Sequence, residues 1–256
     1  MDIATIAGLI LGVFAICGLA MGWNVGPFWD IPSIGVVFGG IMTSLLISQP
    51  LGQLKTMLPA YKYCFTYKSI PPIELIKQIC GFSEIARRDG ILSLENMLES
   101  IKDPFLRQGI QLAVDGTDPE LITDILETEM ENIEDRHAAV RKAWDVLKNG
   151  GPSWGAMGTS IGLVIMLRGG VEDPAKLTAG MAVALITTFY GAVVASYVVG
   201  PFIEKLESRH KDEMSTKAIM LKGIMSLQSG DNPRIVEQKL KIFLPPSQRN
   251  FGRDAG

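Results

Sequence analysis

The chain has 256 residues, of which 47% are hydrophobic and 20% are charged, and its formal net charge is −3. This charge is too small to indicate a nucleic-acid-binding protein. The averages resemble those of a globular enzyme, but the charges are segregated. Residues 1–54 contain no Lys or Arg, whereas residues 55–150 contain 12 and residues 201–256 contain 10.

Apolar stretches without an acidic residue are the dominant feature of the sequence, and they cover residues 3–21, 34–47, 152–167 and 177–200. A helix needs about 20 residues to cross a bilayer core, so the first and last stretches are long enough. The two shorter stretches must begin early, tilt or thin the membrane. The sequence therefore predicts an all-α, polytopic membrane protein with four transmembrane helices and a helical cytoplasmic domain.

The distribution of positive charge predicts the orientation, because Lys and Arg stay on the cytoplasmic side. Residues 1–50 are expected to form transmembrane helices 1 and 2, and residues 151–200 helices 3 and 4. Residues 51–150 then form a cytoplasmic domain and residues 201–256 a cytoplasmic tail, with both termini in the cytoplasm. Asp2 stands where a signal peptide would carry positive charge, so no removable signal peptide is expected.

Other signs of catalytic or metal chemistry are weak. Cys17, Cys64 and Cys80 show no CxxC spacing and are expected to be reduced and structural. His137 and His210 are isolated, so we expect no metal or cofactor. No nucleotide-binding loop or nucleophile with a base is found, and the sequence does not predict an enzyme.

The charged segment is predicted to be mostly helical. Residues 73–101 show helical apolar spacing, and on one helix Arg87 and Glu95 would stand on roughly the same side, two turns apart. Such charges at the rim of an interface guide encounter and register with a partner. A second helix is predicted to begin at Asp118-Pro119, with Asp as the cap, and to continue through Pro152 with a kink.

Small residues recur every four positions in the last two apolar stretches. The longer series runs through Gly180, Ala184, Thr188, Ala192, Ser196 and Gly200, and the shorter through Gly151, Gly155 and Thr159. We expect each series to form a stripe on one helix face, where backbones approach closely. The stripes fit packing within the chain or against a partner helix, and their length favours a partner.

Hydroxyl groups lie on these stripes near the predicted middle of each span. Thr159 and Thr188 have Thr187 close by, and uncharged oxygens can solvate a cation transiently. The alternative is that each hydroxyl bonds to its own helix backbone. Because ion pathways normally need an intramembrane carboxylate and these stretches contain none, either the protein moves no ions or a partner supplies the acid.

Several motifs resemble the MotA/PomA family of flagellar stator subunits over nearly the whole chain. They are GPSWGAMGTSIGL at 151–163, Asp173-Pro174, MAVALITTFYGA at 181–192, IPS at 31–33, Gly39-Gly40, residues 86–95, Asp115-Gly116 and NPR at 232–234. The resemblance implies a bacterial inner-membrane protein. It also implies a ring of five identical subunits around two copies of a single-span B subunit (MotB/PomB type) whose helix carries the essential Asp.

The same resemblance assigns roles to residues. It implies that Pro152 and Pro201 couple ion flow to torque, and that Arg87, Arg88 and Glu95 engage the switch protein of the rotor. It gives the ion path as Thr159, Thr187 and Thr188. The residues expected to pack against the partner helix are Gly155, Gly180, Ala184 and Ala192.

The transported ion is Na⁺ or H⁺, and the threonine set slightly favours sodium, because Na⁺ prefers several oxygen ligands. Two other functions remain open at this stage. One is a TolQ/ExbB-like energiser of an outer-membrane process, which shares the ring-around-a-partner plan. The other is a membrane scaffold that conducts no ions.

Overall fold

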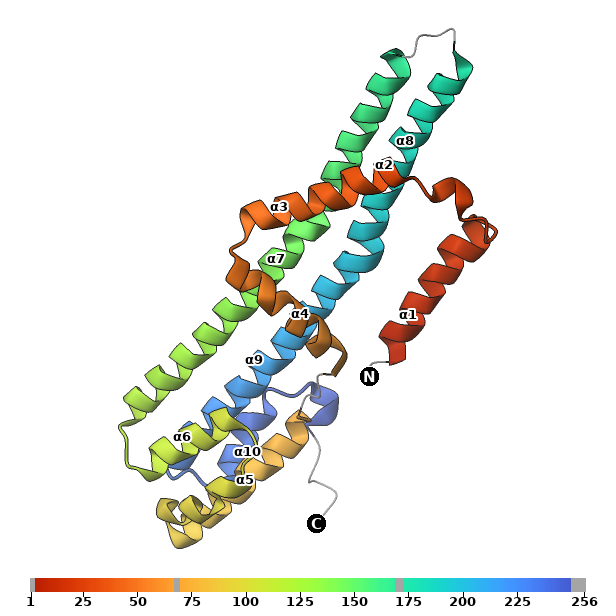
Figure 1. Cartoon of the computed structure of the whole chain (residues 1–256). Helices are drawn as coiled ribbons and strands as arrows, with labels where there is room; N and C mark the ends of the chain where they lie inside the picture. Colours follow the sequence, from red (N-terminus) through yellow and green to blue (C-terminus); the bar gives the residue numbers. More distant parts are fainter. Residues whose placement is uncertain (1–2, 67–69, 169–172, 250–256) are drawn as a thin grey trace. The chain divides into compact units, whose positions relative to one another are not determined.

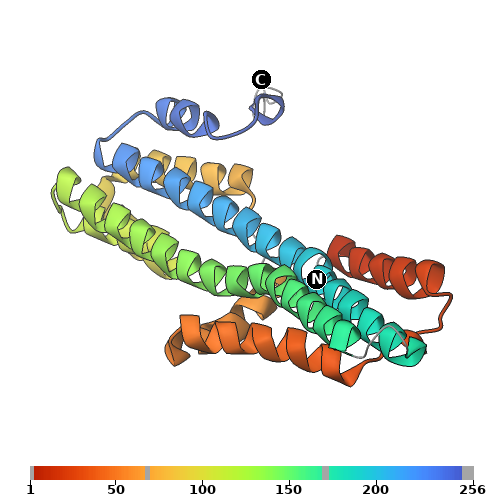
Figure 2. The same ribbon diagram turned by 90° about the horizontal axis from the view of Figure 1, so that it is seen from above.

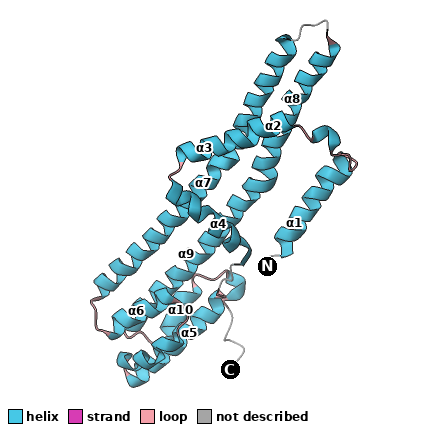
Figure 3. Ribbon diagram, viewed as in Figure 1, coloured by secondary structure: helices cyan, strands magenta, loops and turns pink. Residues whose placement is uncertain are grey.

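The structure is a computed structural model that describes residues 3–66, 70–168 and 173–249. All regular structure in these ranges is helical (Figures 1 and 3). The helices form two compact units. The first, unit 1, comprises residues 1–67 and 137–208, and the second, unit 2, comprises residues 68–136 and 209–256. Each unit is assembled from two separate segments of the chain.

The N-terminal segment of unit 1 contains the first two candidate membrane helices. Helix α1 (Ile3–Val13) continues as π-helical turns over Phe14–Ala20, and a 3₁₀ turn covers Gly26–Phe28. Helix α2 (Ile31–Ile34), a π-helical stretch (Gly35–Gly39) and α3 (Gly40–Ser48) follow without a break. Asp30 starts this run, because its carboxylate accepts from the Ser33 amide at 2.9 Å. Helix α4 (Leu51–Thr66) completes the segment.

The second segment of unit 1 contains parts of two long helices. Helix α7 (Pro119–Arg168) begins with Asp118 as its cap, as predicted, and passes through Pro152 without ending. Helix α8 (Pro174–Ala192) is capped by Asp173, and π-helical turns over Val193–Val199 join it to α9 (Gly200–Gln228). Figures 1 and 2 show α8 running beside the end of α7.

Glycines allow α7 and α8 to approach closely within unit 1. A Cβ built on Gly162 would lie 2.6 Å from the amide nitrogen of Ala184 and 2.7 Å from the Gly180 carbonyl oxygen. Helix α3 meets α7 in a similar way, because the Trp154 ring covers Gly40 and its indole N–H donates to the Ser44 hydroxyl at 2.8 Å. These contacts are the close packing expected of membrane helices.

Unit 2 contains α5 (Pro72–Asp89), a 3₁₀ helix (Ile91–Ser100), α6 (Pro104–Val114), α10 (Pro233–Lys241) and a 3₁₀ turn (Pro246–Gln248). Its apolar core is larger than the clusters of unit 1 and includes Phe105, Ile122 and Met220, all fully buried. Helix α5 packs against both α10 and the 3₁₀ helix. The core comes from both chain segments, so neither segment is a domain by itself.

Among the described residues, three continuous helical runs are long and apolar enough to span a membrane: Ile3–Ala20, Ile31–Ser48 and Pro174–Gln228. The predicted third span, residues 152–167, lies within α7 but is not among them, because Gly, Ser and Thr occupy much of its first half. The membrane protein and the all-helical fold are thus supported, whereas the number of four spans stays a prediction.

Candidate ion-path groove and charged segment

A groove of about 350 Å³ runs between α7 and α8 in unit 1. Its lining consists of Pro152, Ala156, Thr159, Thr188, Ala192 and Ser196. Small and hydroxyl-bearing residues therefore make its walls, and it is a suitable bed for an apolar helix. The structure brings together four residues that the sequence singled out: Thr159, Thr188, Pro152 and Ala192.

The two threonine hydroxyls form one polar cluster in the groove. Thr159 Oγ1 and Thr188 Oγ1 lie 2.6 Å apart, and each lies 3.1 Å from the Ala184 carbonyl oxygen. Thr159 also reaches the Gly155 carbonyl oxygen at 3.1 Å. Because a hydroxyl donates only one hydrogen and keeps lone pairs, this cluster still presents acceptor oxygens to the groove.

Thr187 lies on another face of α8, apart from this cluster. Its side chain is fully buried and its hydroxyl donates within α8, to the carbonyl oxygens of Val183 and Ala184 at 2.9 and 3.1 Å. Its methyl and hydroxyl face Gly158 of α7. The structure therefore gives Thr187 the helix-packing surroundings that were the alternative for each hydroxyl, and its role in the ion path stays a prediction.

The expectation that the α8 series forms one stripe is wrong. A step of four residues turns an α-helix by about 40° more than one full turn, so three steps rotate the series by about 120°. Gly180 and Ala184 are consequently buried against α7, whereas Thr188, Ala192 and Ser196 are exposed at the groove. Within one subunit, Gly155, Gly180 and Ala184 serve the contact between α7 and α8.

The two prolines occupy different places. Pro152 is exposed and lines the groove, while Pro201 is the second residue of α9 and comes directly after the π-helical turns. In those turns the Gly200 amide donates to the Ala195 carbonyl oxygen, five residues back. The structure does not bring the prolines together, and their role in coupling stays a prediction.

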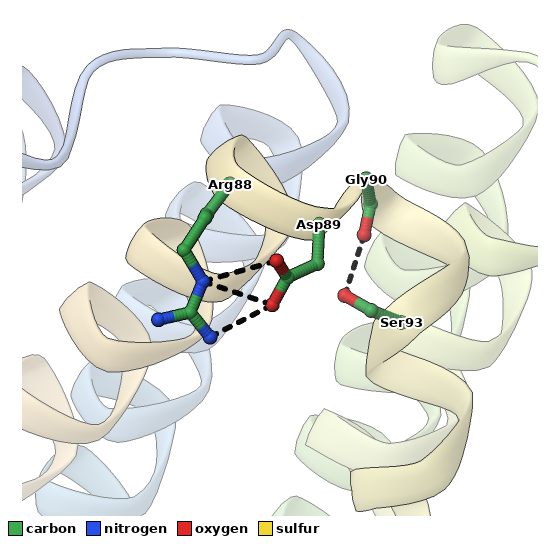
Figure 4. Close-up of polar contacts among 4 residues, drawn as sticks. All are labelled: Arg88, Asp89, Gly90 and Ser93. Carbon is green, nitrogen blue, oxygen red and sulfur yellow. Dashed lines mark hydrogen bonds and ion pairs between the residues drawn. The ribbon is translucent and has the colours of Figure 1, made fainter.

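The predicted single helix over residues 73–101 is wrong, because α5 ends at Asp89. Gly90 comes next with φ 86° and ψ 157°, a conformation that only glycine adopts without strain, and the chain continues as a 3₁₀ helix. Arg87 and Glu95 therefore stand on two different helices. Ser93 stabilises the junction by donating to the Gly90 carbonyl oxygen at 2.6 Å (Figure 4).

Arg88 differs from its neighbour Arg87 in its hydrogen bonding. Its guanidinium donates to both oxygens of Asp89 at 2.8–3.0 Å (Figure 4), which raises the pKa of Arg88 and lowers the pKa of Asp89. Arg87 and Glu95 are exposed, and within the described part of the chain neither has an ion pair. Arg87 is thus the cation of this segment that remains available to a partner.

Ala156 is the groove residue that sequence reasoning missed. Alanine carries no chemical signal, although it lies four residues after Pro152 and three before Thr159, which places it on the same face of α7. A helical projection of α7 centred on Thr159 would have found it.

Comparisons with known proteins agree with this geometry. The model of the MotA/TolQ/ExbB proton channel family matches residues 97–219. Motility protein A of Borreliella burgdorferi is 39% identical, over 98% of this chain and 96% of that protein. Two solved stator structures cover 97–98% of this chain and 98% of theirs: C. jejuni MotAB (27% identity, TM-score 0.87) and the flagellar MotAB stator complex of Bacillus subtilis (28%, 0.86).

These similarities span the chain rather than one motif. The chain belongs to the MotA/TolQ/ExbB proton channel family, whose members are channel-type membrane proteins and not enzymes. Within the family it is a flagellar stator A subunit of the MotA/PomA kind. The matched relatives are motility proteins, so the energiser and scaffold alternatives are not retained.

Proposed function

We propose that this chain forms, with a single-span B subunit of the MotB/PomB type, a membrane complex that converts ion flow into torque on the flagellar rotor. The observation that carries the proposal is the groove between α7 and α8, where Thr159 and Thr188 hydroxyls lie 2.6 Å apart among small residues. A partner helix fits this bed, and its acid would supply the charge that the chain's own apolar stretches lack.

The proposed cycle is a consequence of this arrangement. A cation neutralises the partner's carboxylate beside the threonine oxygens, which lets the partner helix pass the small apolar lining. Release of the ion to the cytoplasm restores the charge. Each charge that crosses the membrane delivers about 2.3 kcal/mol per 100 mV. Pro152, at the groove, and Pro201, at the exit of the last span, would transmit the change to the cytoplasmic part.

The proposed topology has four spans, with α7 contributing the third, both termini in the cytoplasm and the protein in the inner membrane. Residues 51–150 and 201–256 would then be cytoplasmic, and Arg87 and Glu95 would meet the rotor's switch protein. We further propose a ring of five copies around two B subunits. The near-complete coverage of solved MotAB chains supports an assembly of this kind.

Sodium is the proposed ion. The Thr159 and Thr188 hydroxyls and the Ala184 carbonyl cluster within 3.1 Å of one another, and such oxygens suit a cation that needs several ligands. A proton would need only the partner's carboxylate.

Swimming speed measured against external sodium, at constant membrane potential, tests the function and the ion separately. Deletion of the gene should paralyse cells that retain filaments. Thr159→Val and Thr188→Val should each raise the sodium concentration for half-maximal speed about tenfold, the scale of one lost oxygen contact. Ser160→Ala is the matched control, because that exposed hydroxyl bonds only to the Ala156 carbonyl and does not line the groove. Speed that depends on pH and not on sodium would overturn the choice of ion.

A further inference from the structure

A second cavity, of about 190 Å³, lies within unit 2, where the end of α5 meets the turn after α9. Its lining includes Ser83, Ala86, Arg87, Ile91, Gln228 and Asp231. The function proposed above uses only Arg87 of this set. The other lining residues therefore raise the question of what the cavity binds.

Gln228 provides an acceptor that the fold leaves unused. Its amide nitrogen Nε2 donates to the Thr117 carbonyl oxygen at 2.5 Å, and this bond fixes which end of the amide is oxygen. The Oε1 atom is buried and accepts no hydrogen bond from any residue that the structure describes. A buried acceptor without a donor is unfavourable, so a donor from outside the chain would be bound strongly.

The charges around the cavity are unequally engaged. Asp231 is paired with Lys239, whose Nζ lies 2.5 Å from its carboxylate, and this contact holds the pKa of Asp231 below its usual range. The Ser83 hydroxyl donates to the Asp231 backbone carbonyl at 3.3 Å. Arg87, in contrast, has no ion pair within the described residues. The cavity thus combines a free donor group, Arg87, with a free acceptor, Gln228 Oε1.

Size and chemistry restrict the occupant. Small-molecule sites usually measure about 300–1,000 Å³, so this cavity suits a single side chain rather than a cofactor. A carboxylate could accept from Arg87 but could not donate to Gln228, and a lysine or arginine would face the Arg87 charge. An uncharged amide satisfies both, because its NH₂ donates and its oxygen accepts.

We propose that this cavity receives one Asn or Gln side chain of the rotor protein that the stator drives. The amide NH₂ donates to Gln228 Oε1 and the amide oxygen accepts from Arg87. This inference rests on the function proposed above, since Arg87 makes the cavity continuous with the segment that would meet the rotor. It adds Gln228 and the turn after α9 to that contact.

Two variants of Gln228 separate binding from folding. Gln228→Met and Gln228→Glu both lose the bond to Thr117, but only methionine also removes the acceptor oxygen. Counting fluorescent stators at motors, we expect about tenfold fewer with Gln228→Met, the scale of a lost buried hydrogen bond, and near-normal numbers with Gln228→Glu. Equal effects of the two variants would overturn the inference.

The partner is identified by photo-crosslinking in cells with assembled motors. An aliphatic diazirine amino acid at Ile91, in the cavity wall, should give an adduct with the rotor's switch protein, whereas the same probe at Leu121, an exposed residue of unit 2 outside the lining, should not. An adduct only with a second copy of this chain, or none, would overturn the rotor as occupant. Paralysis of the deletion strain would still support the stator function, so the two failures are distinguishable.

Discussion

Arg87 and Arg88 are adjacent arginines with different availability. The Arg88 guanidinium is held by Asp89, while Arg87 lines the small cavity and has no ion pair among the described residues. An arginine already bound to a carboxylate must give up that contact before it can bind a partner. Neighbouring residues of one type therefore need not contribute equally to an interface.

We expect Arg87→Ala to lower stall torque more than Arg88→Ala, by roughly a factor of three, the scale of a rim charge. Single-motor rotation of a tethered load measures it. The control is the double variant Arg87→Ala with Asp89→Asn, which frees Arg88 and should regain part of the torque. A larger loss with Arg88→Ala would contradict the assignment.

Cys80 is the residue whose titration the fold shifts most clearly. Burial, followed by the nearby charges of Glu237 and Glu84, raises the pKa of this thiol from its ordinary value of 9.0 to about 11. The thiolate is the reactive form, so the shift protects this thiol at neutral pH.

With Cys17 and Cys64 replaced by Ala, alkylation by iodoacetamide at pH 8 should be about a hundredfold slower at Cys80 than in the unfolded chain. The rate should keep rising with pH towards about 11, because deprotonation is delayed in the folded protein. Glu237→Gln removes one of the raising charges and should speed the reaction. A rate that levels off near pH 9 would show that the thiol is not perturbed.

Among the elements, the contact between α7 and α8 is the most intolerant of added volume. The nearest atoms to a Cβ on Gly162 belong to the backbone of α8, which cannot move aside as a flexible side chain can. The small residues at this contact are needed for the fold of the single subunit, before any partner is bound.

Gly162→Ala should therefore lower the stability of the purified complex by about 1–3 kcal/mol, as overpacking does. Gly39→Ala is the matched control, because nothing lies within 4 Å of its Cβ position and alanine favours a helix. Thermal unfolding in detergent measures both. Similar melting temperatures for the two variants would contradict the close contact.

Helix starts are predictable from sequence, while rotations and breaks are harder to obtain. The Asp118-Pro119 start is confirmed because a cap is a local signal, and passage through Pro152 is confirmed as well. The break at Gly90 escapes prediction because the apolar spacing persists beyond it. The prediction of one stripe is wrong because small residues on successive turns drift around the helix, and only the position of α7 decides which of them are covered.

For the molecule as a whole, the groove between α7 and α8 is a surface that a bound helix would cover. Thr188 and Ala192 are exposed there although they lie in an apolar stretch. Whatever binds the folded chain and not the unfolded one stabilises it by mass action.

Adding the B subunit at about one hundred times its dissociation constant should raise the stability of the chain by about 2.7 kcal/mol. Ala192→Trp fills the groove and should remove this increment, while Leu185→Trp, at an exposed position outside it, should preserve it. Differential scanning fluorimetry with and without the partner measures the difference. An equal increment for both variants would place the partner elsewhere.

The π-helical turns at Val193–Val199 have a consequence for how changes of chain length are tolerated. A π turn accommodates a residue in excess of the α-helical count. Removing one residue there would let the turns relax towards an α-helix, so Phe202 and Ile203, both buried in unit 1, could keep their directions. The same deletion within the regular part of α8 would rotate both side chains by about 100° relative to the residues before it. Single-residue deletions in functional descendants of this chain should therefore collect in the π-helical stretch and be rare in the α-helical turns on either side.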